Sequence, residues 1–190
     1  MVFMVARDAD TGEVASVAQW AIPTSASPVD MEKQEKDTET ETAQEREDRQ
    51  ERQAFEDELY FNSLPSTSNR ALIMEFTKDL RNLRQRILQG QPHFLLENLA
   101  THPEHRERGL AARLISDALG MADERGVVVY LETAEDNAAR GLYERLGFEE
   151  RGRETIGDLR RFASKEEMDR VGVKGTYTHV GYVRVPRGKD

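Results

Sequence analysis

A short turn between a predicted strand and a predicted helix gathers residue types that bind anions. The stretch "HPEHRERGLAARLI", residues 102–115, carries Arg106, Arg108 and Gly109 before it continues into small and aliphatic residues at helical spacing. The first turn of a helix leaves its backbone N–H groups without intrahelical acceptors, and the helix dipole favours negative charge there. The stretch therefore predicts a phosphate or diphosphate site, although a purely structural turn also fits this pattern when it is taken alone.

Hydrophobic patterns around the turn predict the elements that position it. From residue 93 onward, the patterns follow the order strand, helix, strand, helix, strand, strand, which is typical of a mixed α/β domain. These elements are expected at 93–101, from Gly109 to about Glu124 with an end at Gly126, at "VVVYLET", at "NAARGLYERLG", and at 148–156 and 178–185.

The first half of the chain predicts a hairpin and one amphipathic helix. Two β-rich runs, at about 2–8 and 13–22, flank "DTGE", which is turn chemistry between antiparallel strands. The helical stripe consists of Leu72, Phe76, Leu80, Leu83 and Ile87. We expect Ser68 or Asn69 to cap this helix, Gly90 to end it, and its stripe to face a core.

An acidic insertion lies between the hairpin and that helix. From Asp30 to Glu58 there are thirteen Asp and Glu residues against five Lys and Arg, so this span carries eight of the nine net negative charges of the 190-residue chain. Such a segment is either disordered or a solvated helix. We expect the charged insertion at 25–62 and the amphipathic helix within 63–90. The insertion is either an inert surface or an attraction for cationic substrates.

Composition argues against several classes of protein. Outside the insertion the chain is nearly neutral, so no basic face is available to neutralise the phosphates of a nucleic acid. The chain has no cysteine, its histidines lack metal-ligand spacing, and its apolar runs are short. We expect a single domain over 1–190 with no metal, nucleic-acid or membrane partner. The absence of a signal-peptide pattern favours a cytoplasmic or nucleocytoplasmic location.

Two spaced motifs together resemble the acetyl-CoA signatures of the GNAT superfamily of N-acetyltransferases. The first is Arg106-x-x-Gly109-x-Ala111 directly after a strand, where the family has Gln/Arg-x-x-Gly-x-Gly/Ala. The second lies in "NAARGLYERLGFEE", where the residues in register with the family pattern are Asn137, Leu142, Tyr143, Gly147 and Phe148. The resemblance covers residues 93–185 closely, and the opening hairpin resembles the second and third strands of the family.

The resemblance implies a fold and a co-substrate. The fold would be α/β (α+β), with a mixed, mostly antiparallel sheet, a splayed central parallel strand pair, flanking helices, and the charged helical insertion between the hairpin and the central strand. Acetyl-CoA would bind with its diphosphate on the backbone amides of 106–112 and its pantetheine arm beside 99–101. The cofactor-binding residues so implied are Leu99, Ala100, Thr101, Arg106, Glu107, Arg108, Gly109, Leu110, Ala111, Ala112, Asn137 and Tyr143.

Glu97 and Tyr143 are the catalytic residues that the resemblance implies. Glu97 occupies the place on the central strand where several family members keep a general base, although a carboxylate without catalytic duty is an equal alternative. Tyr143 would lie near the sulfur of the departing thiolate. Complete proton transfer from an ordinary tyrosine to that thiolate is uphill by about 2 kcal/mol, so we expect Tyr143 to donate a hydrogen bond instead.

The function so implied is acetyl-CoA-dependent transfer of an acetyl group to a primary amine. Because the chain has no cysteine to carry an acyl group, the amine would attack directly in a ternary complex. The acceptor would be a small molecule or a peptide, and the acidic insertion favours a cationic one. A coenzyme A-binding module without turnover is the alternative from a different class, and an interaction protein that docks through its acidic helix is a third.

Two features depart from the family pattern. GNAT domains usually begin with a strand and two helices, whereas this sequence begins at what resembles the second strand. Either those elements are missing or residues 54–90 replace them in space, and an open sheet edge would favour closure by a homodimer. The family also commonly joins its third and fourth strands by a short turn, where this chain carries the insertion.

Overall fold

The computed structural model describes residues 1–23, 42–172 and 175–188, which divide into two compact units. The first unit contains the described residues of Met1–Met31, Gln91–Gly152 and Val180–Asp190. The second contains those of Glu32–Gly90 and Arg153–His179. The expectation of a single acetyltransferase domain stays a prediction.

Six strands form one sheet in the order β1-β2-β3-β4-β6-β5. Their bounds are β1 (Val2–Arg7), β2 (Val14–Ala21), β3 (His93–Thr101), β4 (Val128–Ala134), β5 (Glu149–Ile156) and β6 (Tyr177–Arg184). Strand β2 pairs antiparallel with both β1 and β3, whereas β3 and β4 run parallel. This topology confirms the predicted fold class, a mixed and mostly antiparallel sheet with a central parallel pair.

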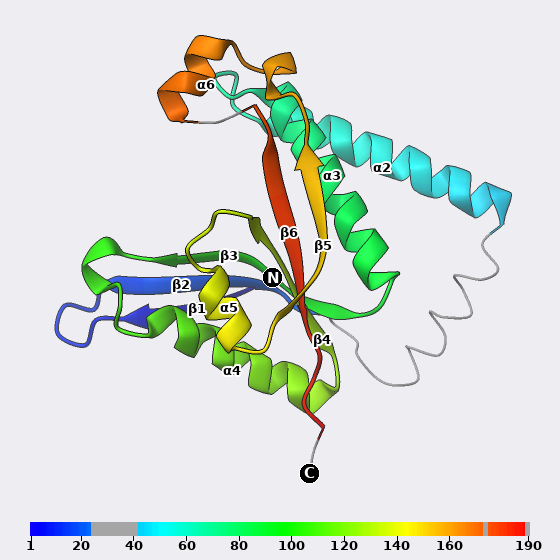
Figure 1. Cartoon of the computed structure of the whole chain (residues 1–190). Helices are drawn as coiled ribbons and strands as arrows, with labels where there is room; N and C mark the ends of the chain where they lie inside the picture. Colours follow the sequence, from blue (N-terminus) through cyan, green and yellow to red (C-terminus); the bar gives the residue numbers. More distant parts are fainter. Residues whose placement is uncertain (24–41, 173–174, 189–190) are drawn as a thin grey trace. The chain divides into compact units, whose positions relative to one another are not determined.

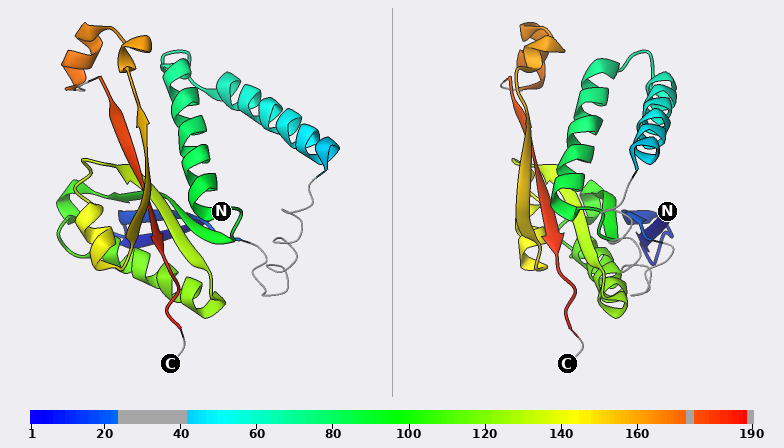
Figure 2. Two further views of the ribbon diagram at one scale, coloured as in Figure 1. Left: turned by 45° about the vertical axis from the view of Figure 1, so that its right-hand side comes forward. Right: turned by 90° about the vertical axis from the view of Figure 1, so that its right-hand side faces the viewer.

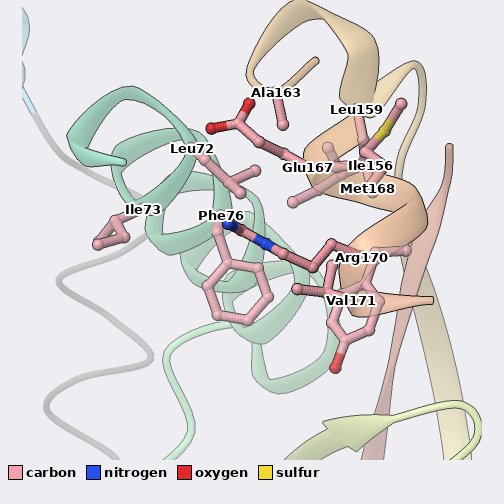
Figure 3. Close-up of a pocket in the computed structure, with 11 residues that line it drawn as sticks. Leu72, Ile73, Phe76, Ile156, Leu159, Ala163, Glu167, Met168, Arg170 and Val171 are labelled. Carbon is pink, nitrogen blue, oxygen red and sulfur yellow. The ribbon is translucent and has the colours of Figure 1, made fainter. Parts of the chain in front are cut away.

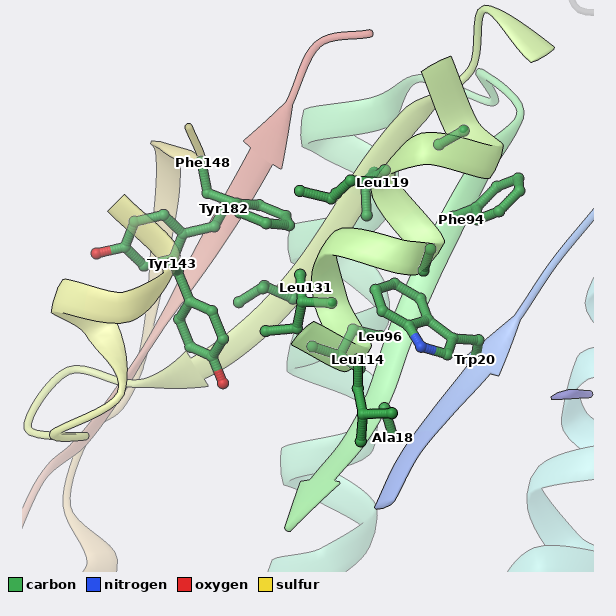
Figure 4. Packing of buried hydrophobic residues seen from close by; sticks show 14 of the residues in the cluster. Ala18, Trp20, Phe94, Leu96, Leu114, Leu119, Leu131, Tyr143, Phe148 and Tyr182 are labelled. Atoms are coloured by element: carbon green, nitrogen blue, oxygen red, sulfur yellow. The ribbon is translucent and has the colours of Figure 1, made fainter. Parts of the chain in front are cut away.

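Helix α4 (Leu110–Arg125) covers one face of β1, β2 and β3 in the first unit (Figure 1). It begins after Gly109 and ends at Gly126, as the sequence predicts. Its buried side chains are Leu114, Ile115, Ala118, Leu119 and Ala122. They pack with Trp20 and Phe94 in the main hydrophobic core (Figure 4), because the helical period brings all five to one side of α4.

The connections of the first unit include two short helical segments. A 3₁₀ turn, η1 (Pro103–His105), follows β3, and helix α5 (Arg140–Arg145) follows β4. The predicted strand at 93–101 and the helical stretch in "NAARGLYERLG" are thereby confirmed. The final strands lie within one residue of the predicted bounds of 148–156 and 178–185.

The second unit contains α2 (Ala43–Ser63), α3 (Arg70–Leu88), η2 (Leu159–Arg161) and α6 (Lys165–Val171). Figure 2 shows a short turn joining α2 to the start of α3. Helix α2 has no buried residue, so this part of the acidic insertion is a solvated helix. Residues 25–41 of the predicted insertion lie outside the described residues.

Helix α3 carries the predicted amphipathic stripe and one correction at its end. The Asn69 side chain accepts a hydrogen bond from the amide of Leu72, so Asn69 is the cap. The helix ends at Leu88 with Gln89 in the left-handed conformation, rather than at Gly90. The Gln89 amide still reaches the carbonyl of residue 85, and the expected Gly90 follows one position later with a φ of 82°.

A small hydrophobic core holds the second unit together. Ile156, Leu159 and Met168 are buried there, and Leu72 and Phe76 of α3 pack against them. The Asn69 side-chain amide also donates to the carbonyl of residue 162, which ties the start of α3 to the segment between β5 and β6. The sequence predicted this segment only as a polar connection, because its helices are too short to show a clear period.

Candidate active site

The turn between β3 and α4 leaves a run of backbone amides open. The Arg106 amide donates to the Pro103 carbonyl at 3.3 Å, and the Arg113 amide donates to the Gly109 carbonyl at 3.0 Å. Between these two points, among the residues that the structure describes, the amides of 107–112 donate to no backbone or side-chain acceptor. Of the amides predicted to bind a diphosphate, that of Arg106 alone has an acceptor among the described residues.

Two left-handed residues shape this turn. Glu107 has a φ of 60° and Gly109 a φ of 76°, so the chain curls and consecutive N–H groups line a concavity. A Cβ atom on Gly109 would meet no other atom within 4 Å, so the conformation rather than crowding favours glycine here. The open space beside Gly109 and the unsatisfied amides together fit an anionic ligand.

The two arginines of the turn differ in their hydrogen bonds and ion pairs. The Arg108 guanidinium donates to His105 Nδ1 at 2.6 Å and lies 3.9 Å from the carboxylate of Asp8. Hydrogen bonds from the amides of 10–11 lower the pKa of Asp8, with a smaller contribution from the charge of Arg108. Arg106 is exposed and forms no ion pair within the described part of the chain, so its charge is the more available one.

The central parallel strands separate halfway along their length. Their register runs from His93 opposite Val128 to Leu96 opposite Leu131 and stops there. Residues 98–101 of β3 continue to pair with β2 but have no β4 partner. The splay expected near the ends of these strands is therefore present, and it leaves one edge of β3 able to pair with an extended ligand.

The predicted pantetheine-binding segment lies along this open half of β3. Leu99 is partly buried against the main core, and Ala100 is exposed. The Ser16 hydroxyl donates to the Ala100 carbonyl at 2.9 Å and shares a 2.9 Å hydrogen bond with the Thr101 hydroxyl. Strand β2 therefore fixes this segment from one side, and its other side faces the splay.

Glu97 lies where the splay begins, on a β-bulge. Gln19 is opposite Asn98 and Trp20 is opposite Leu96, so Glu97 is the extra residue of β3. The Glu97 and Asn98 side chains are both exposed, and both bind Gln19. Gln19 Nε2 donates to Glu97 Oε2 at 2.9 Å, and Asn98 Nδ2 donates to Gln19 Oε1 at 2.8 Å. The sequence analysis did not find Gln19.

Tyr143 is a buried residue of α5. It is 6 % exposed, and its ring lies 6.1 Å from that of Phe148 and 6.3 Å from that of Tyr182 (Figure 4). Burial raises the pKa of the Tyr143 phenol, because the phenolate loses solvation. A weaker acid is less able to transfer its proton fully, so the environment favours the expected role as a hydrogen-bond donor.

A polar network anchors α5, which carries Tyr143. Arg140 Nε donates to the Tyr182 hydroxyl at 2.9 Å, and that hydroxyl donates to Glu144 Oε1 at 3.0 Å. Tyr182 is 1 % exposed, so this network joins α5 to a fixed position on β6. The sequence offered no signal for it, because Arg140 and Tyr182 are 42 residues apart.

Asn137 lies in the turn that precedes α5. Its Nδ2 donates to the Thr133 hydroxyl at 2.8 Å, and its Oδ1 accepts from the Ala139 amide at 2.8 Å. The side chain therefore shapes its own turn, and one of its two amide hydrogens remains for a ligand. The role of Asn137 in binding acetyl-CoA stays a prediction.

The second unit contains an apolar cavity of about 520 Å³ (Figure 3). Its walls come from α3, from the last residue of β5, from the segment between β5 and β6, and from Tyr177. Phe76 and Met168 contribute apolar surface, and the Glu167 carboxylate is held by the amide and hydroxyl of Ser164. Most of the lining is apolar, with Glu167 and Arg170 as its charged side chains, so the cavity suits a largely apolar group.

Among the described residues, no group of three or more His, Cys, Asp and Glu side chains is placed to hold a metal ion. No helix in the described ranges combines the length and apolar character needed to cross a membrane.

Three solved structures are similar to this chain, and the first two show that it shares their fold. Arylalkylamine N-acetyltransferase 2 from Aedes aegypti is 15 % identical with a TM-score of 0.57, and the match covers 97 % of this chain and 73 % of that one. The polyamine N-acetyltransferase of Drosophila melanogaster is 14 % identical with a TM-score of 0.54, over 96 % and 74 %. The ribosomal-protein-S18-alanine N-acetyltransferase of Escherichia coli is 23 % identical with a TM-score of 0.38. This last match covers 52 % of this chain and 57 % of that one.

A comparison with family models identifies the family. No curated protein matches the sequence. The model of the acetyltransferase (GNAT) family, however, matches residues 31–148, which is more than half of the chain. The matched span includes the splayed strands, the open amides and α5. The chain therefore belongs to the GNAT family of acetyltransferases.

Proposed function

We propose that this protein transfers an acetyl group from acetyl-CoA to a primary amine. The observation that carries the proposal is the run of open amides at 107–112 beside a strand edge that has no β4 partner. A diphosphate needs several hydrogen-bond donors, and an extended amide-containing arm needs a free strand edge. Acetyl-CoA has both groups, and membership of the GNAT family supports its binding.

The residues of the turn would hold acetyl-CoA as follows. The amides of 107–112 would bind the diphosphate, with additional charge from Arg106. The segment 99–101 would pair with the pantetheine arm, and the remaining amide hydrogen of Asn137 would also face it. When bound, acetyl-CoA supplies an acetyl group activated as a thioester.

Glu97 would accept the proton that an acceptor amine must lose. An alkyl ammonium has a pKa of about 10.4, so presenting it as a free amine at pH 7 costs about 4.6 kcal/mol. Because Gln19 occupies Oε2, the proton would go to Glu97 Oε1, directly or through water. The amine would attack the thioester directly in a ternary complex, without a covalent enzyme intermediate. Tyr143 would donate a hydrogen bond to the thiolate that leaves.

The acceptor and the assembly are proposed from charge and from the sheet edge. Eight of nine net negative charges lie in the acidic span at 30–58, which attracts a cationic small molecule or peptide. Strand β1 lies at the edge of the sheet and exposes Phe3 and Val5 at 61 % and 44 %. Such an edge favours pairing with a second copy in a homodimer, which light scattering tests. The cytoplasmic location remains a prediction from the sequence.

Two measurements separate an enzyme from a binding module. Acetyl-CoA at well above a micromolar dissociation constant should raise the melting temperature, because it binds only the folded chain. A panel of amines is then assayed for release of free thiol. Melting unchanged by acetyl-CoA would contradict the proposal, and stabilisation without amine-dependent thiol release would leave a coenzyme A-binding module.

Replacing Tyr143 with Phe should separate catalysis from binding. Tyr143→Phe removes only the hydroxyl, so we expect an unchanged dissociation constant for acetyl-CoA and a kcat about 10-fold lower. Steady-state kinetics and calorimetry test the two quantities separately. An unchanged kcat would remove Tyr143 from the proposed mechanism.

A further inference from the structure

We propose that Gln19 is a positioning residue that holds the Glu97 carboxylate at the start of the splay. The inference deepens the proposed acetyltransferase function and rests on it. Gln19 belongs to β2 rather than to either of the two sequence motifs. The geometry that carries the inference is the chain of two hydrogen bonds from Asn98 through Gln19 to Glu97.

The β-bulge explains why one side chain meets two consecutive residues of β3. Side chains of a regular strand alternate between the two faces of the sheet, so neighbours in sequence point apart. The extra residue at the bulge breaks this alternation and re-aims the side chains beside it. Glu97 and Asn98 consequently both reach Gln19, which is opposite Asn98 in the register.

The chemistry of the three side chains fixes the direction of the hydrogen bonds. An ionised carboxylate only accepts, so the Gln19 amide must turn its NH₂ group toward Glu97. Its carbonyl then faces away and accepts from Asn98 Nδ2. The amide orientation of Gln19 is therefore set by this network, and Gln19 is held at both of its polar atoms.

The two carboxylate oxygens of Glu97 have different roles in this arrangement. Oε2 of Glu97 is occupied by Gln19, whereas Oε1 is left to receive a proton. Because Glu97 is exposed, its side chain would otherwise sample several rotamers, and only some would direct Oε1 toward the start of the splay. Gln19 therefore restricts Glu97 to one orientation.

A purely structural bridge between β2 and β3 is the competing explanation. Those strands are already paired through their backbones on both sides of the bulge, from Ser16 opposite Thr101 to Ala21 opposite Leu95. A side-chain bridge at Gln19 adds little to that pairing. The two explanations differ in one respect: only positioning makes the effect of Gln19 depend on the carboxylate at residue 97.

A double-mutant cycle tests this dependence. The variants are Gln19→Met, which keeps the side-chain length without a donor, Glu97→Gln, and the two combined. We expect Gln19→Met to lower kcat about 10-fold with the KM for acetyl-CoA unchanged. In the Glu97→Gln background, Gln19→Met should cause no further loss, because the group that it positions is absent.

Exchange of the two residues serves as the matched control. Combining Gln19→Glu with Glu97→Gln keeps an amide and a carboxylate at the bridge but moves the carboxylate to β2. Because no carboxylate remains at residue 97, this variant should be as slow as Glu97→Gln alone. A structural bridge would instead appear as a loss of unfolding free energy in Gln19→Met that this exchange restores. Urea unfolding of all variants shows whether the fold is intact.

The outcomes distinguish this inference from the proposed function. If Gln19→Met slows the Glu97→Gln enzyme by the same factor as the wild type, or leaves the wild-type kcat unchanged, Gln19 is not a positioning residue. A fully active Glu97→Gln variant would overturn the inference while acetyl transfer stands. A wild-type protein that releases no thiol with any amine would overturn both.

Discussion

The two ends of α4 have the same backbone conformation but opposite degrees of hydrogen bonding. Gly109 and Gly126 flank the helix with φ values of 76° and 67°, and a Cβ on either would meet no atom within 4 Å. At the second end, the amides of residues 126 and 127 donate to carbonyls of the last helical turn. At the first end, the described residues offer no acceptor for the amides of 107–112.

The charges near the two ends differ in the same sense. Asp123 in the last turn opposes the helix dipole, and Arg184, 4 % exposed, neutralises it through two hydrogen bonds. At the first end, Arg106 has no acidic partner among the described residues. One end of α4 is thus completed by the protein itself, whereas the other is completed only by water or a ligand. The contrast predicts that substitutions at the first end change the affinity for acetyl-CoA, whereas those at the second end change the free energy of unfolding.

The largest expected effect comes from substituting valine for the glycine at each end of α4. Valine disfavours a positive φ, so Gly109→Val and Gly126→Val should lower the free energy of unfolding by similar amounts, about 1 to 2 kcal/mol. Only Gly109→Val places a side chain in front of the open amides, so it should weaken acetyl-CoA binding at least about 100-fold. Calorimetry and urea unfolding of both variants measure the two effects. Equal binding by both variants would remove the diphosphate from this end of α4.

A smaller effect is expected from the ion pair at the closed end. Asp123→Asn leaves the buried Arg184 guanidinium without its charged partner and should lower the free energy of unfolding by about 2 kcal/mol. Acetyl-CoA binding should be unchanged, because the pair lies at the far end of the helix. Weaker binding in a variant that remains folded would contradict the division between the two ends.

The pH dependence of stability follows from the same pair. Hydrogen bonds from Arg184 hold the pKa of Asp123 below its usual range. A depressed pKa contributes stability that is present above the unfolded value of about 3.9 and is lost as pH falls through the folded value. The difference in unfolding free energy between the wild type and Asp123→Asn should therefore shrink progressively as the pH falls below about 4. A constant difference down to pH 2 would contradict this assignment.

The smallest effects separate the two arginines at the open end. Arg106→Gln should raise the dissociation constant for acetyl-CoA about 10-fold, with a weaker dependence on salt. Arg108→Gln should raise it only about 3-fold, because Asp8 already neutralises part of that charge. Titrations at two salt concentrations measure both. The reverse order would show that Arg108 leaves Asp8 when the ligand binds.

The sequence was sufficient to predict the helices and strands of the first unit and the position of the turn between β3 and α4. Run lengths and apolar periods predicted β3 and β4, and Gly109 and Gly126 marked both ends of α4, because glycine is favoured where φ is positive. The open amides followed from general helix geometry. These features depend on residues that are close together in the chain.

Features that depend on register or on distant residues were not predicted. The bulge at Glu97 and its bridge to Gln19 arise from the alignment of two strands separated by the whole insertion. The partial neutralisation of Arg108 depends on Asp8, about one hundred residues earlier. No local pattern encodes such contacts, whereas the structure places them directly beside the predicted motifs.

The response of individual backbone amides to ligand tests the proposed diphosphate site most directly. NMR chemical shifts are measured for the full chain with saturating coenzyme A and, separately, with pantetheine, which lacks the diphosphate. We expect coenzyme A to shift the amides of 107–112 strongly, and pantetheine to affect 99–101 while leaving 107–112 unchanged. Amides at 107–112 that do not respond to coenzyme A, or respond equally to pantetheine, would contradict the claim that this end of α4 binds a diphosphate.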